Sequence, residues 1–201
     1  MANLVTASRL LFLLLAICLV YFGSPLAHLL NVLLLVLVFV SDGLDGYIAR
    51  KRNETSLFGA VFDIAADRIV ELCLWVVFVD IGMIPVWIPL VFIARGIMTD
   101  SIRTTECQSK TQAPFALVES PLAKFLVSGR FVRGFYATIK AIAFCLLMLA
   151  FSLTQLLDPS FESFVENIYQ LGLLLCYLSV VICLVRGAPV ITEFIQKSRP
   201  Q

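Results

Sequence analysis

Charged residues are scarce in this sequence. Only 14% of its 201 residues are Asp, Glu, Lys or Arg, whereas 60% are hydrophobic; a typical soluble domain carries about 25% charged residues. A soluble chain of this size could not bury so much apolar surface, and a net charge of +1 gives no field to attract a polyanion. The six cysteines include no CxxC pair that would indicate a metal or redox site. These absences exclude a soluble globular enzyme, a disordered chain and a typical nucleic-acid-binding protein.

What remains is an all-α integral membrane protein. Six apolar stretches are long enough for transmembrane helices, which need about 20 residues each. They cover residues 4–22, 26–47, 58–81, 84–103, 131–156 and 168–186. Turn signals separate several of them, at Gly23-Ser24-Pro25, at Gly82 with Pro85, and at Asp158-Pro159-Ser160. No internal repeat or interdomain linker interrupts the series, so we predict a six-transmembrane-helix bundle that forms one membrane domain over residues 1–201.

Basic residues are missing from the three predicted turns on one side of this bundle. All 15 Lys and Arg residues fall on the other side, which the positive-inside rule assigns to the cytoplasm. The outer turns carry acidic residues instead, namely Asp80, Asp158, Glu162 and Glu166. We therefore expect a multi-pass protein of the cell (inner) membrane with both termini in the cytoplasm.

Acidic residues gather where the second and third predicted helices meet. Asp42 and Asp45 are three residues apart and Asp63 and Asp67 are four apart, so each pair shares one helical face. The turn between the helices makes them antiparallel neighbours, which lets all four carboxylates converge. A carboxylate at membrane depth costs on the order of 3 kcal/mol, so the cluster requires bound cations or shared protons. Such hard oxygen ligands suit Mg²⁺ or Mn²⁺, and two ions side by side can hold a phosphoryl group.

Three alternative roles for these acids fit the sequence less well. Interfacial ion pairs with Arg50, Lys51 and Arg68 would account for one isolated acidic pair better than for two helically spaced pairs. A cation or proton transporter needs polar groups through both halves of the bilayer, and the outer halves of these helices hold almost no ionisable groups. A structural scaffold has no use for four clustered carboxylates. A metal-dependent enzyme facing the cytoplasm is therefore the leading hypothesis.

The spacing of the acids resembles a known signature. The segment reads Asp42-x2-Asp45-Gly46-x2-Ala49-Arg50-x8-Gly59-x3-Asp63-x3-Asp67. It is similar, at every fixed position, to the signature of the CDP-alcohol phosphatidyltransferase family. Because the family fold is six transmembrane helices with the site facing the cytoplasm, the resemblance extends over the whole chain.

The resemblance implies a reaction and a role for each residue. Members of the family displace CMP from a CDP-linked lipid with an alcohol. By similarity, the four acids Asp42, Asp45, Asp63 and Asp67 hold two metal ions, Mg²⁺ or Mn²⁺, and Asp67 also takes the proton of the attacking hydroxyl. The residues expected at the CDP moiety are Gly46, Ala49, Arg50, Ser56, Gly59, Thr6 and Arg9. The implied partners are CDP-diacylglycerol, a small polar alcohol and the lipid bilayer, and a homodimer is a further expectation because family members commonly form dimers.

The first residues of the chain point to one branch of the family. Asn3-Leu4-Val5-Thr6-Ala7-Ser8-Arg9 resembles the N-x2-T-x2-R opening of the phosphatidylglycerophosphate synthase branch. Ile64 and Gly96 depart from that branch, which usually has proline and glutamate there. The expected acceptor is sn-glycerol 3-phosphate, while inositol phosphate, serine and phosphatidylglycerol stay open as alternatives. The basic residues expected to bind the phosphate of the acceptor are Arg95, Arg103, Arg133 and Lys140.

Overall fold

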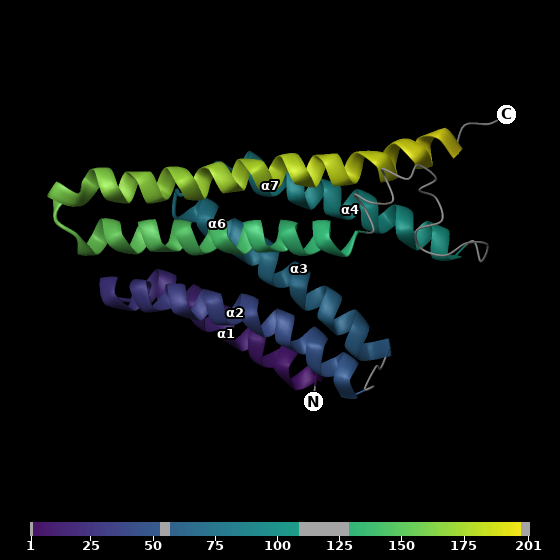
Figure 1. Ribbon diagram of the computed structural model, residues 1–201, viewed down its shortest axis with the longest axis horizontal. Helices are drawn as coiled ribbons and strands as arrows, with labels where there is room; N and C mark the ends of the chain where they lie inside the picture. Colours follow the sequence, from purple (N-terminus) through teal and green to yellow (C-terminus); the bar gives the residue numbers. More distant parts are fainter. Residues whose placement is uncertain (1, 53–56, 109–128, 198–201) are drawn as a thin grey trace. The chain divides into compact units, whose positions relative to one another are not determined.

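The described part of the protein is helical nearly throughout. The structure is a computed structural model that describes residues 2–52, 57–108 and 129–197. Within these ranges there are no strands, and the elements follow in the order α1 (Ala2–Phe22), α2 (Pro25–Arg52), α3 (Leu57–Asp80), α4 (Trp87–Gln108), α6 (Arg130–Leu156), the short 3₁₀ helix η1 (Pro159–Phe161) and α7 (Glu162–Lys197) (Figure 1). The predicted all-helical fold is confirmed.

Several helices are longer than the apolar stretches that predicted them. Helix α2 continues past residue 47 to Arg52, and α7 begins before residue 168 and continues past residue 186 to Lys197. Hydropathy marks the apolar length of a helix, whereas the backbone hydrogen bonds that form the helix continue into polar residues. The polar connection between residues 104 and 129, whose sequence favours a short surface helix, lies largely outside the described residues.

The helices end at the predicted turns. Helix α1 ends at Phe22, where the amide of Gly23 donates a hydrogen bond of 2.9 Å to the carbonyl of Leu19. After α3, Gly82 has a φ of 74°, a left-handed conformation that glycine adopts without steric cost. Pro159 begins η1, where its fixed φ and missing N–H suit the first position of a helix.

Two helical segments among the described residues are long and apolar enough to cross a membrane. They are Phe131–Leu156 and Pro159–Gln196, and Thr6–Phe22 and Pro25–Ser41 are shorter apolar helices. In α3, acidic and basic residues such as Asp63, Asp67 and Arg68 interrupt the apolar run. The count of six spans and the cytoplasmic position of the termini stay predictions.

The chain divides into two compact units. Unit 1 comprises Met1–Pro85 and Ala141–Leu173, and unit 2 comprises Val86–Lys140 and Leu174–Gln201. Helices α6 and α7 each contribute one part to either unit. The expectation of a single domain over residues 1–201 stays a prediction.

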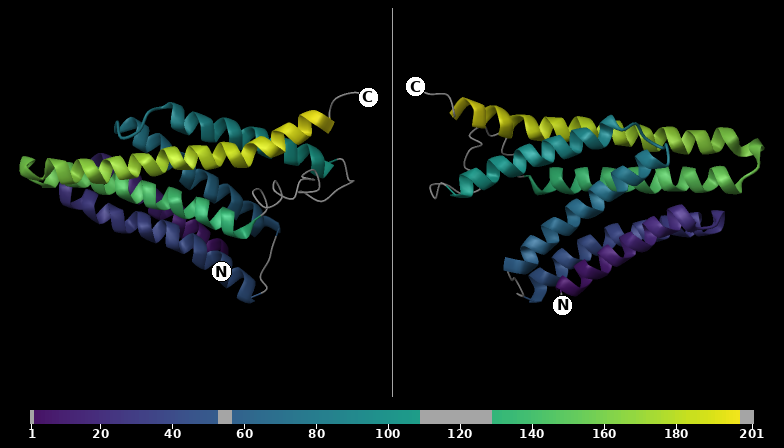
Figure 2. Two further views of the ribbon diagram at one scale, coloured as in Figure 1. Left: turned by 45° about the horizontal axis from the view of Figure 1, so that its top comes forward. Right: turned by 180° about the vertical axis from the view of Figure 1, so that it is seen from behind.

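Aromatic side chains form the centre of unit 1. The ring of Phe144 on α6 lies 6.0 Å from that of Phe39 on α2 and 5.6 Å from that of Phe78 on α3, and it meets Trp75 edge-on at 4.5 Å. Each such aromatic pair stabilises the fold by roughly 0.5–1.5 kcal/mol in addition to the free energy gained by burying its apolar surface. Helix α1 packs against α2 and α3, and Figures 1 and 2 show α1 and α2 side by side. This packing brings the first turns of α1 to the first turns of α3.

In unit 2, helix α4 packs against the C-terminal part of α7. Ile102 and Val190 are buried there, with Ile191 and Phe194 against them. The rings of Trp87 and Tyr177 stack with their centroids 5.8 Å apart. The two segments lie alongside each other in both views of Figure 2.

Candidate functional site

Two of the four predicted acids lie on one face of α3. Asp63 and Asp67 are one helical turn apart, and their side chains are 48% and 52% exposed. The half-buried Gly59 lies one turn before Asp63. The N-terminal part of α3 therefore presents two neighbouring carboxylates whose side chains are partly accessible from outside the protein.

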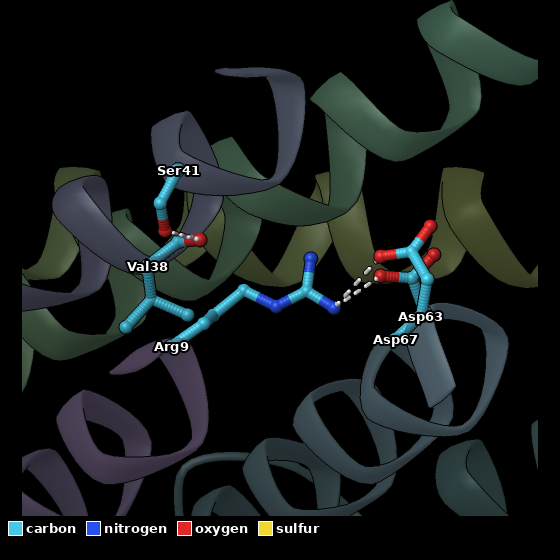
Figure 3. A network of polar contacts seen from close by, with 5 residues as sticks. All are labelled: Arg9, Val38, Ser41, Asp63 and Asp67. Carbon is cyan, nitrogen blue, oxygen red and sulfur yellow. Dashed lines mark hydrogen bonds and ion pairs between the residues drawn. The ribbon is translucent and has the colours of Figure 1, made fainter. Parts of the chain in front are cut away.

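The guanidinium group of Arg9 lies against both carboxylates. Its Nη2 atom donates a hydrogen bond of 2.8 Å to Oδ1 of Asp67 and lies 3.8 Å from Oδ1 of Asp63 (Figure 3). The Arg9 side chain is only 2% exposed. A buried charge is costly unless an opposite charge and hydrogen bonds compensate it. Asp63 and Asp67 provide this compensation, and Arg9 thereby links α1 to α3.

The neighbouring positions on α1 and α2 are also buried and polar. Thr6 lies one turn before Arg9, and both it and Ser41 are buried. The hydroxyl of Ser41 donates to the carbonyl oxygen of Val38 in its own helix at 2.9 Å, as Figure 3 shows. Helix α2 continues directly into the predicted acidic segment, so positions 42 and 45 lie within it, one turn apart.

Several predicted residues fall outside what the structure describes. For Asp42, Asp45, Gly46, Ala49 and Arg50 only the helical backbone of α2 is described, and Ser56 lies outside the described residues altogether. In the part of the chain that the structure describes, no three His, Cys, Asp or Glu residues are grouped so that they could hold a metal ion. The roles predicted for these residues, and for Thr6, Gly59 and Arg9 at the CDP moiety, stay predictions.

The described acids nevertheless fit a divalent metal ion by their chemistry. Ionised carboxylates offer only acceptor oxygens, and such hard ligands suit ions of the Mg²⁺ and Mn²⁺ type. About half of each side chain of Asp63 and Asp67 is exposed, although Oδ1 of Asp63 is buried, so an ion has access to part of each side chain. Asp63 and Asp67 would supply two of the four predicted ligands.

Unit 2 contains a second group of charged side chains, around the ring of Tyr136 on α6. The Nζ atom of Lys140 lies 4.3 Å from the centre of this ring and 6.0 Å from that of Phe92 on α4. The Cζ atom of Arg186 on α7 lies 5.3 Å from the centre of the Tyr136 ring. Two cations thus contact one aromatic ring. Each such cation–π contact contributes about 0.5–2 kcal/mol of attraction.

Arg95 approaches α7 beside this group. A Cβ atom at Gly187 would lie 2.9 Å from Cγ and 3.1 Å from Nε of Arg95, so the absence of a side chain at position 187 leaves room for the arginine. The Nε atom of Arg95 is buried and has no hydrogen-bond partner among the residues described. We call Arg95, Tyr136, Lys140 and Arg186 the basic cluster of unit 2.

The basic cluster includes two of the four residues predicted to bind the acceptor. Arg95 and Lys140 belong to it, whereas Arg133 is exposed on α6 and the side chain of Arg103 lies outside the described residues. Tyr136 and Arg186 are not among the residues that the sequence predicted at the acceptor. The available signals were the four-residue spacing from Tyr136 to Lys140 and the position of Arg186 at the predicted inner end of the last helix.

Comparison with known proteins gives consistent matches. Among curated proteins, a CDP-diacylglycerol–glycerol-3-phosphate 3-phosphatidyltransferase of Rickettsia bellii is 33% identical over 115 residues, which cover 56% of this chain and 62% of that protein. A Bacillus subtilis protein of the same name is 32% identical over 79 residues, 39% of this chain and 41% of that protein. A cardiolipin synthase (CMP-forming) of Streptomyces coelicolor is 40% identical over 77 residues, 38% of this chain and 36% of that protein. The matched part of the chain thus spans less than two thirds of each of these relatives.

The match to a family model extends much further along the chain. The model described as CDP-alcohol phosphatidyltransferase matches residues 1–185. This range contains the Arg9–Asp63–Asp67 contact, the whole signature segment on α2 and α3, and the basic residues Arg95 and Lys140. The chain therefore belongs to the CDP-alcohol phosphatidyltransferase family.

Proposed function

We propose that the protein transfers the phosphatidyl group of CDP-diacylglycerol to sn-glycerol 3-phosphate, giving phosphatidylglycerophosphate and CMP. The observation that carries this proposal is the family match over residues 1–185, which includes every fixed position of the signature. The acceptor is proposed from the names of the Rickettsia bellii and Bacillus subtilis relatives. The contact of Arg9 with Asp63 and Asp67 supports an active site at the acids of the signature.

The proposed enzyme works in the cell (inner) membrane. Six spans with both termini in the cytoplasm would place the signature acids at the cytoplasmic surface, where CMP and a water-soluble acceptor exchange freely. Support comes from the helices found at all six predicted positions and from the one-sided distribution of Lys and Arg. A site at this depth lets the acyl chains stay in lipid while the headgroup reaches water.

In the proposed mechanism, the residues of this chain position the two substrates and accept a proton. A carboxylate oxygen of Asp67 accepts the proton of the acceptor hydroxyl as the hydroxyl oxygen bonds to the phosphorus of the phosphatidyl group. The bond from that phosphorus to the bridging oxygen breaks, and CMP leaves with the electron pair. Two Mg²⁺ or Mn²⁺ ions, held by Asp42, Asp45, Asp63 and Asp67, would neutralise charge on the diphosphate oxygens.

The remaining predicted residues bind the two substrates in this proposal. The CDP moiety would contact Gly46, Ala49, Arg50, Ser56, Gly59, Thr6 and Arg9. The planar guanidinium of Arg50 suits a phosphate group. The acceptor phosphate would bind to Arg95 and Lys140, with Arg103 and Arg133 contributing. The basic cluster supports this assignment and adds Arg186, because a phosphate monoester carries about two negative charges near neutral pH.

Phosphatidylglycerol is a second candidate acceptor, because the Streptomyces coelicolor relative is named a cardiolipin synthase (CMP-forming). The basic cluster favours an acceptor with a phosphate monoester, which carries more charge than the phosphodiester of phosphatidylglycerol. Inositol phosphate also fits this criterion, whereas serine does not. Glycerol 3-phosphate is therefore the acceptor that both the cluster and the relatives' names support.

The experiment that tests the proposal measures CMP release by the purified full chain in lipid. The chain is given CDP-diacylglycerol and one acceptor at a time: glycerol 3-phosphate, inositol phosphate, serine or phosphatidylglycerol. We expect the highest kcat/KM with glycerol 3-phosphate. A higher value with phosphatidylglycerol would reassign the acceptor and leave the reaction in place, whereas no CMP release with any acceptor would contradict the reaction itself.

A further inference from the structure

We propose that Arg9 is an internal counter-cation of the acidic site. Without a divalent metal ion, Arg9 forms an ion pair with Asp63 and Asp67. When the metal ion and the CDP-lipid bind, the acids coordinate the metal and Arg9 contacts the diphosphate of the lipid instead. This inference rests on the proposed metal-dependent function. It differs from a simple CDP-binding role, because it gives Arg9 two alternating anionic partners.

Arg9 is buried against the two acids of α3. Arg9 lies 58 residues from Asp67 in the sequence and on a different helix, yet its Nη2 atom is 2.8 Å from Asp67 Oδ1 and 3.8 Å from Asp63 Oδ1. Its side chain is 2% exposed, so it is not a surface anchor that reaches out to lipid headgroups. This buried arginine thus contacts the same oxygens that a metal ion needs.

The guanidinium of Arg9 and a metal ion compete for these carboxylate oxygens. An oxygen that accepts a charge-assisted hydrogen bond from a guanidinium has given up one of its ligand positions. A fixed positive charge beside the acids also repels a divalent cation. Two ligands that compete for one site each lower the apparent affinity of the other. We therefore infer that metal binding weakens the contact of the guanidinium with Asp67.

The displaced guanidinium needs another anion, because leaving a buried charge unpaired is strongly destabilising. In the proposed reaction the CDP-lipid supplies one, a diphosphate whose oxygens match the planar donors of arginine. The exchange of partners couples the two binding events: metal binding releases Arg9 for the diphosphate, and the diphosphate holds Arg9 away from the acids. By thermodynamic linkage each ligand then favours the other.

The test is a titration of the full chain in lipid nanodiscs with Mn²⁺, followed by electron paramagnetic resonance, with and without CDP. Arg9→Gln removes the competing charge, so Mn²⁺ should bind roughly ten-fold more tightly without CDP, about 1.4 kcal/mol. Arg9→Lys keeps the charge and should stay within about three-fold of wild type. Because CDP also binds Mn²⁺ directly, the informative quantity is the gain in Mn²⁺ affinity on adding CDP, which should be larger in wild type than in Arg9→Gln.

Arg68→Gln is the matched control. Arg68 follows Asp67 on α3, so its substitution removes the same charge close to the same acids. Its Nη1 atom lies 4.0 Å from Oε2 of Glu71. Its effect on Mn²⁺ affinity should be clearly smaller than that of Arg9→Gln. Thermal unfolding gives a second readout: Arg9→Gln should lower the Tm in EDTA more than in saturating Mn²⁺, whereas a purely structural arginine would lower both equally.

The outcomes separate this inference from the proposed function. Unchanged or weaker Mn²⁺ binding in Arg9→Gln, or an equal gain from CDP in wild type and variant, overturns the inference and leaves the metal-dependent reaction in place. A wild-type protein that binds no Mn²⁺ overturns both.

Discussion

Two groups of charged side chains in the described part of the molecule stabilise their charges in opposite ways. In unit 1, Arg9 is buried against carboxylates of the opposite sign, Asp63 and Asp67. In unit 2, Lys140 and Arg186 lie over the same ring of Tyr136, and the buried Nε of Arg95 has no hydrogen-bond partner among the described residues. Each arrangement suits one kind of ligand. Carboxylates that are about half exposed suit a cation such as a metal ion, whereas a group of basic side chains suits an anion.

Metal removal tests the acidic side of this comparison and has the largest expected effect. If Asp63 and Asp67 hold a catalytic metal ion, EDTA should abolish CMP release, and Mg²⁺ or Mn²⁺ should restore it, because the diphosphate charge is neutralised only while the metal is bound. CMP release at several metal concentrations is the measurement. Full activity in a metal-free preparation would contradict the metal site.

The substitution Asp67→Asn tests the proposed base. Because general-base catalysis contributes roughly 10²- to 10⁴-fold, we expect kcat to fall by about this factor while CDP-diacylglycerol still binds. Asp80→Asn is the matched control at the other end of α3, where the carboxylate accepts a hydrogen bond of 2.7 Å from Tyr21, and it should keep kcat near wild type. Near-normal turnover of Asp67→Asn across the pH range would show that another group takes the proton.

Arg95→Ala and Lys140→Ala test the basic side. Charge-assisted hydrogen bonds contribute on the order of 1.5–3 kcal/mol, so each substitution should raise the KM for glycerol 3-phosphate about ten-fold or more. The KM for CDP-diacylglycerol should hardly change. A two-substrate kinetic matrix measures both constants, with the exposed Arg133→Ala as the comparison, for which we expect a smaller increase. If both variants keep the wild-type KM for the acceptor, the phosphate binds elsewhere.

Gly187→Ala tests how the basic cluster is positioned and has the smallest expected effect. The new Cβ atom would lie 2.9 Å from Arg95 Cγ, so the arginine must shift, and the KM for glycerol 3-phosphate should rise about three-fold, roughly 0.6 kcal/mol. Gly172→Ala is a matched control on the same helix, since its Cβ would lie 3.2 Å from a side-chain carbon of Leu147. It should affect stability without changing the acceptor KM. Equal KM values in both variants would show that Arg95 tolerates the added methyl group.

The sequence by itself determined the local features of this protein. Apolar length and turn residues predicted the positions of six helices, because a helix forms through hydrogen bonds between residues four apart. The spacing of Asp63 and Asp67 predicted their shared face for the same reason, and the signature on two consecutive helices identified the family. All of these depend on residues that are near one another in the chain.

Only the tertiary structure decided which distant side chains meet. Arg9 and Asp67 are 58 residues apart, and nothing in the spacing of either indicated that the arginine would lie on the acids. The same holds for Gly187 against Arg95, and for Arg186 over Tyr136. The physical reason is that most of these helices carry apolar residues on every side, so hydrophobic periodicity does not mark the face that packs against a neighbour. The contacts follow from side-chain packing between helices, which no local pattern in the sequence records.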